Sequence, residues 1–253
     1  MRILSRAALL GSLVLAAATA QPAAAADSLT VGLSPNKGGS LLLGAPTTFS
    51  IKALTPDVPY GNDGNTRLSA IKVNMPEQLL FNTTGFTLCQ VSVFMEQRVC
   101  PAKSKLGDVD MTVDGGPDFP SPIAATAELY FGSGFTVLAF VHAAEPAPID
   151  EPVVGELRSS RERGYGLQIY IPVPGKLSAP IDNVYPVVRS MDATVTPPTR
   201  KVKIDGKKAV LPLAGLATCK GDLNFSLSIV YTDANRTTEK TSSPASYKAK
   251  CKK

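Results

Sequence analysis

Short runs of alternating apolar and polar residues recur along the chain, and the clearest are residues 165–171 and 223–231. A period of two places successive side chains on opposite faces, so each run predicts a strand with one buried face. Asp205-Gly206 is a strong hairpin signal between the runs 201–204 and 208–211. About a dozen such segments predict an all-β fold, and we expect an Ig-like β-sandwich of two layers.

Glycine and proline mark the turns of this fold. The 253 residues include 20 glycines and 21 prolines but no tryptophan, which suits many short strands joined by turns, and we expect no long helix. Gly132-Ser133-Gly134 predicts a turn between strands at 124–131 and 135–141. Residues 143–164, with several prolines and a charged run, are expected to form a mobile connecting segment, with at most a brief strand pairing at Val153-Val154. It stays open whether that segment joins two sub-domains or lies within one sandwich.

The N-terminus has the pattern of a secretory signal peptide. Two arginines precede an apolar run at residues 7–19, and small-residue cleavage patterns end at Ala20 and Ala26. The apolar run is shorter than the ~20 residues that a membrane-spanning helix needs, and no later run is long enough. We therefore predict cleavage near Ala20 or Ala26, with residues 1–26 as signal peptide and 27–253 as a secreted, extracytoplasmic domain.

The four cysteines are expected to form disulfides, because an exported chain meets an oxidising compartment. Three pairings are possible, and we favour Cys89 with Cys100 and Cys219 with Cys251, since each pair closes a local segment. A zinc site of four cysteines would normally show C-x-x-C spacing, which is absent, and His142 is the only histidine. We expect no metal site and no cofactor.

The residues around the first cysteine pair predict local structure. Between Cys89 and Cys100 the apolar spacing indicates a short helical turn, which Pro101 would end. Ser104 has the hydroxyl needed to cap a turn, and Gly107 is expected to open the next strand.

Charge divides the chain into an acidic body and a basic C-terminal part. Without Arg2 and Arg6 the 26 basic residues fall to 24 against 21 acidic ones, a net charge of +3. From Arg200 onward there are 12 basic and 4 acidic residues, a net charge of +8, which leaves −5 for residues 27–199. This is either a solvated surface or a weak, salt-sensitive contact with anionic envelope polymer, glycan or lipid head groups. The candidate binding residues are Lys201, Lys203, Lys207, Lys208, Lys248, Lys250, Lys252 and Lys253.

Nucleic acid is not an expected partner. The chain is predicted to be exported, and its lysines are not interleaved with aromatic residues that could stack on bases. Its oligomeric state stays open.

Three carboxylates share one face of the strand predicted at residues 108–114. Asp108, Asp110 and Asp114 alternate there with apolar residues. They could bind a cation or supply a glycosidase acid pair, but such a pair needs partial burial in a cleft. We interpret them as solvent-facing acids and leave cation binding open.

Two further polar features have structural interpretations. Asn62, Asp63 and Asn65 offer oxygen ligands for Ca²⁺, but the closing glutamate of a calcium loop is missing, so an ordinary Asx turn is favoured. His142 follows an apolar run, and we interpret it as the polar end of a strand and not as a catalytic base.

Several segments resemble a known group of proteins: Leu88-Cys89, residues 99–107, 129–132 and 213–219, and Cys251-Lys252-Lys253. The chain resembles exported actinobacterial proteins that share a C-x10-C-P-x2-S-x-L-G motif and a C-terminal cysteine pair. The group has no assigned activity. The resemblance implies export and paired cysteines, and it carries over no catalytic residue.

The sequence therefore predicts a non-catalytic, secreted or cell-envelope β-sandwich protein that binds anionic envelope polymer. Two alternatives stay open: a glycan-active hydrolase with a carboxylate pair near Asp108, Asp110 and Asp114, and a purely structural surface protein.

Overall fold

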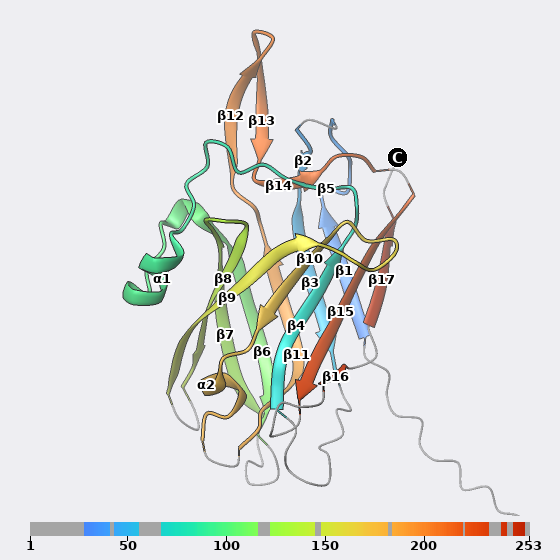
Figure 1. Ribbon diagram of the computed structural model, residues 1–253. Helices are drawn as coiled ribbons and strands as arrows, with labels where there is room; N and C mark the ends of the chain where they lie inside the picture. Colours follow the sequence, from blue (N-terminus) through green and yellow to red (C-terminus); the bar gives the residue numbers. More distant parts are fainter. Residues whose placement is uncertain are drawn as a thin grey trace, which may run out of the picture.

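The computed structural model describes residues 28–40, 43–55, 67–115, 122–144, 148–181, 184–219, 221–232, 239–241 and 245–250. In these ranges the chain forms 17 strands, and 12 of them belong to one antiparallel sheet (Figure 1). The predicted signal peptide lies outside the described residues. No helix in the described ranges has both the length and the apolarity to cross a bilayer.

The large sheet curls until its two ends meet. The strand at one end, Ser28–Ser34, lies beside a strand at the other end, Ala245–Lys250. The sheet therefore forms two facing layers with the core between them. The strand order is β1 (Ser28–Ser34), β3 (Thr48–Leu54), β11 (Val187–Val195), β6 (Lys105–Asp114), β7 (Ile123–Gly132), β8 (Thr136–Ala143), β9 (Ile149–Ser159), β10 (Leu167–Pro172), β4 (Arg67–Met75), β15 (Asp222–Thr232) and β16 (Glu239–Thr241), with β17 (Ala245–Lys250) also paired to β15.

Smaller elements occupy the two ends of this body. A three-stranded sheet of β2 (Ala45–Pro46), β14 (Ala214–Leu216) and β5 (Leu79–Phe81) covers one end, from which the hairpin of β12 (Thr199–Ile204) and β13 (Lys207–Pro212) projects. Helix α2 (Gly175–Ser178) lies at the opposite end, against β4 and β9.

The all-β, disulfide-bonded fold predicted from the sequence is confirmed, and its facing layers belong to one curled sheet. The two predicted hairpins form as β7–β8 and β12–β13. Asp205 and Gly206 both have positive φ, at 48° and 77°, as a two-residue hairpin turn requires.

The prediction that residues 143–164 form a connecting segment is wrong. Ile149–Ser159 forms β9, which pairs with β8 on one side and β10 on the other inside the large sheet. Glu151 and Gly155 lie on the same inward face of this strand as Val153. They interrupt the apolar alternation that would have predicted the strand. The strand was therefore hidden in the sequence.

The cysteine motif is a structural unit. Cys89 and Cys100 are bridged across a Cα–Cα distance of 5.2 Å and enclose α1 (Val91–Gln97), as predicted. The turn η1 (Ala102–Ser104) follows, and the Ser104 hydroxyl donates a hydrogen bond of 2.7 Å to the Pro101 carbonyl. Gly107 does not open the strand, which begins at Lys105. It lies beside a register shift between β6 and β7, and on its other side the backbone of Thr194 in β11 leaves no room for a side chain.

A buried network of polar side chains connects neighbouring strands of the large sheet. Asn74 is 1% exposed and donates a hydrogen bond of 3.0 Å to the Ser226 hydroxyl. Its carbonyl oxygen accepts from Gln168 at 2.9 Å and Ser160 at 3.2 Å, and Arg158 in turn donates to Gln168. The network joins β4, β9, β10 and β15 at positions where no apolar residue packs.

Candidate functional site

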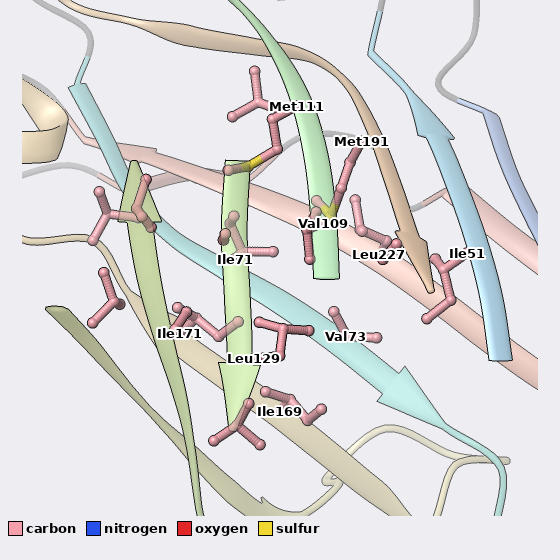
Figure 2. A pocket seen from close by; sticks show the side chains of 18 of the residues that line it. Ile51, Ile71, Val73, Val109, Met111, Leu129, Ile169, Ile171, Met191 and Leu227 are labelled. Atoms are coloured by element: carbon pink, nitrogen blue, oxygen red, sulfur yellow. The ribbon is translucent and has the colours of Figure 1, made fainter. Parts of the chain in front are cut away.

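An apolar cavity of about 260 Å³ lies between the two layers of the large sheet. It is larger than the ~150 Å³ cavity that stays dry and takes benzene in a protein core, and it approaches the ~300 Å³ lower end of ligand pockets. Figure 2 shows side chains from both sides pointing into it, among them Val73 of β4, Leu129 of β7 and Met191 of β11.

Among the described residues, every one that lines the cavity is apolar. Ile71, Val73 and Ile169 are only half-buried although they point inward, because part of their surface faces the cavity. A sugar or peptide would lose its hydrogen bonds to water here without replacement, at a cost of about 1–3 kcal/mol for each polar group. The lining therefore suits a hydrocarbon and disfavours a polar ligand.

Alanines at inward positions account for part of this space. Ala125 of β7 lies directly opposite Ala143 of β8, and Ala127 and Ala139 also line the cavity from these strands. Small side chains side by side in one layer leave space towards the opposite layer that larger side chains would fill. The alanines were visible in the sequence, but there these segments predicted only a hairpin.

The two ends of the cavity differ. Beside the three-stranded sheet, the lining residues Leu79, Leu106 and Ala214 are buried. At the α2 end, Ile149 of β9 and Leu177 of α2 are half-buried. The described part of the lining is therefore packed most tightly at the hairpin end and least tightly at the α2 end.

Charged pairs surround the α2 end. Arg189 donates to Asp114 at 2.6 Å, and Lys176 of α2 lies 3.7 Å from Glu151 of β9. Arg67 precedes the lining residue Leu68 and its guanidinium stacks on the ring of Tyr185 at 5.0 Å. The Nε atom of Arg67 is buried without an acceptor among the described residues. Polar groups are thus available at this end for the head of an amphiphile.

The three predicted acids point away from the cavity. Asp108, Asp110 and Asp114 alternate along β6 with Val109, Met111 and Val113, which line it. Asp108 pairs with Lys105 at 2.7 Å, and Asp114 pairs with Arg189. Asp110 lies opposite Asp192 of the neighbouring strand β11. The acids therefore lie along the outer face of the sheet.

A small ionic cluster at the start of β6 shifts several pKa values. Hydrogen bonds to Asp108 and Glu128 raise the pKa of Lys105, and Lys105 in turn lowers the pKa of Glu128. Burial and the hydrogen bond to Glu128 raise the pKa of Tyr130. The cluster keeps its charges at neutral pH, and its residues lie outside the cavity lining.

His142 was predicted to end a strand, and it is the last residue but one of β8, with only Ala143 after it. Its Nδ1 atom lies 2.5 Å from a carboxylate oxygen of Asp150, and Thr126 is its cross-strand neighbour on the other side. The histidine and aspartate side chains are 56% and 47% exposed. The three residues lie on the outer face of the sheet, and none of them is among the residues that line the cavity.

The structure divides the predicted lysine set. Lys201, Lys203, Lys207 and Lys208 lie together on the β12–β13 hairpin. Lys248 and Lys250 lie on another element, strand β17, with exposed side chains. Lys252 and Lys253 lie outside the described residues.

The other predicted sites are accounted for in part. Cys219 is disulfide-bonded, and its predicted partner Cys251 lies outside the described residues, as do Asn62, Asp63 and Asn65. Across the described ranges, no three His, Cys, Asp or Glu side chains are grouped so that they could hold a metal ion.

Comparison with known proteins gives no relative: no family model, no curated protein and no solved structure matches this chain.

Proposed function

We propose that this protein is a non-catalytic, exported binding protein that holds an acyl chain or a similar hydrocarbon inside its sheet. The observation that carries the proposal is the cavity of about 260 Å³, whose described lining residues are all apolar. Removing a hydrocarbon from water provides the driving force, and the apolar character of these lining residues provides the selectivity.

The size of the effect follows from the hydrophobic transfer of methylene groups. Each buried CH₂ contributes about 0.8 kcal/mol, which corresponds to about fourfold in Kd. Affinity for a series of linear alcohols should therefore rise about fourfold per carbon and stop rising once the cavity is full.

The test is a fluorescence titration of the mature protein with an uncharged naphthylamine probe. The chain has no tryptophan, so intrinsic indole emission does not interfere. We expect saturable probe binding, displaced by alkanols in order of chain length. Val73→Phe should lower probe affinity, because this side chain points into the cavity and would fill it.

The matched control is Lys72→Phe, the same aromatic residue at the adjacent position of β4 on the opposite face. Its probe affinity should equal that of the parent protein. No saturable binding, or equal loss in both variants with unchanged thermal stability, would exclude a ligand in the cavity.

Contact with anionic envelope polymer is a second candidate function. It is favoured by the grouping of Lys201, Lys203, Lys207 and Lys208 on one hairpin. The hydrolase alternative has less support, since its three acids lie along an open sheet face. A purely structural role would be recognised by ordered self-association.

A further inference from the structure

The β12–β13 hairpin is a two-stranded sheet of its own that projects from the body of the protein (Figure 1). At its base β13 lies beside β2, and the Arg200 guanidinium stacks at 5.7 Å on Phe86. An isolated two-stranded hairpin is marginally stable in water. Because the hairpin projects beyond the packed core, a role in binding explains its presence more simply than a role in stability.

The hairpin brings like charges together. Residues 199–212 contain five basic residues and one acidic residue, Asp205, a net charge of +4. Lys203 lies directly opposite Lys208, and Lys207 follows the turn next to them. Directly opposed like charges in a sheet are destabilising. An anionic surface would remove this repulsion.

Apolar side chains accompany these lysines. Ile204 adjoins the turn at the tip and is 37% exposed, and Val210 is 46% exposed. Ile204 shares a face with Val202, two residues away in β12. On that face Ala209 lies opposite Val202 and Lys207 lies opposite Ile204, whereas Val210 lies on the other face, opposite Lys201. A soluble anionic polymer would contact the lysines but would gain little from exposed isoleucine.

We infer that the β12–β13 hairpin docks tip-first on an anionic lipid bilayer. Ile204 enters the head-group region, and Lys203, Lys207 and Lys208 contact the lipid phosphates around it. This combination of basic and apolar side chains is the one that binds the interface of anionic membranes. None of the hairpin residues lines the cavity, so the docking site and the ligand site are separate.

The test is co-sedimentation of the mature protein with vesicles of phosphatidylcholine, alone or mixed with phosphatidylglycerol. We expect binding to the anionic vesicles only, weakening as salt is raised. Lys203→Gln with Lys208→Gln should weaken binding about fivefold for each lysine removed. Ile204→Ser should weaken it at both low and high salt, because the apolar contact is not screened.

The matched control is Lys248→Gln with Lys250→Gln, which removes the same charge from β17. It should leave most vesicle binding intact. Equal losses in both double variants would mean that net charge, and not the hairpin, determines binding, and would overturn the proposal.

Dextran sulfate separates a bilayer from an anionic polymer. If the parent protein binds it as tightly as the vesicles, and Ile204→Ser affects neither, the hairpin binds charge alone and the bilayer proposal is wrong. Unchanged probe binding in the cavity shows that the hairpin variants are folded.

Discussion

The interior of the large sheet and the β12–β13 hairpin are built from the same alternation of residues but differ in surroundings. Inside the sheet, the apolar face meets a second layer and encloses a cavity whose described lining residues are apolar. On the hairpin, no second layer covers Ile204 or Val210, and both remain exposed. Strand formation is therefore the same in the two regions, and burial is not.

This difference separates stability from binding. A residue in the packed body contributes to stability through the area it removes from water, whereas a hairpin residue has little area to lose. Substitutions should therefore cost most in the core, less in its polar network and least on the hairpin.

The largest effect is expected from Phe131→Ala. Phe131 is fully buried and stacks on Phe81 with ring centroids 5.7 Å apart. Its removal should lower the free energy of unfolding by about 3–5 kcal/mol. Val210→Ala, on the hairpin, should change it by less than about 0.5 kcal/mol. Urea denaturation of both variants measures the contrast, and similar losses would contradict it.

Removal of the first disulfide should have the next largest effect. Cys89→Ala with Cys100→Ala frees a segment of separation 11, so the unfolding free energy should fall by about 3 kcal/mol. The urea midpoint with and without the bridge measures this loss. Probe binding in the cavity should persist at low temperature, since neither cysteine lines it. An unchanged midpoint would show that the bridge does not support the body.

A smaller cost is expected from Asn74→Ala. The change removes the acceptor of the Gln168 amide NH2 group and the partner of the Ser160 and Ser226 hydroxyls, and should cost about 1–3 kcal/mol. Asn224→Ala is the control, because its amide makes only a long, exposed hydrogen bond of 3.4 Å to Gly164. Thermal unfolding of both variants gives the comparison, and equal shifts would argue against a cooperative network.

Lys203→Glu should stabilise the β12–β13 hairpin slightly and weaken the binding of the protein to anionic vesicles. It replaces a like-charged pair with Lys208 by an opposite pair, worth about 0.2–1 kcal/mol. Slower hydrogen exchange of the β12 and β13 amides reports the stabilisation, and Lys203→Gln should fall between. Faster exchange in the glutamate variant would show that repulsion is not present in the hairpin.

The smallest effect concerns pH. Lys105 lowers the pKa of Glu128 from its ordinary value of 4.5, so folding favours the carboxylate. The stabilisation is complete above about pH 4.5 and is lost as pH falls through the lower pKa of the folded state. The stability difference between the parent and Glu128→Gln should therefore shrink in acid. Urea midpoints measured on both sides of that value test this, with Glu77→Gln as control; a constant difference would contradict it.

Prediction from the sequence succeeded where local signals were strong. Asp205-Gly206 identified its hairpin, and the spacing of Cys89 and Cys100 identified their bridge. It failed for β9, where Glu151 and Gly155 broke the apolar pattern of a central strand. A strand held on both edges by neighbours tolerates such interruptions, because pairing with β8 and β10 fixes it in place.

The candidate site lay beyond the reach of local signals. The predicted hairpin already grouped four of the lysines, but only the fold showed that this hairpin projects from the body and that Lys248 and Lys250 lie on a separate strand, β17. The cavity was not found at all, since the same inward residues could have filled a solid core.

The sequence by itself determined most of the strands but not β9, and it determined which side chains share a face in them and where the first covalent bridge closes. Each of these depends on neighbours within a few residues or on a short loop. Only the tertiary structure decided that the sheet curls back to its first strand, that its apolar face encloses space and that one hairpin stands free. These outcomes depend on the distance between layers and on small neighbouring residues such as Ala125 and Ala143, which a turn of the chain brings side by side.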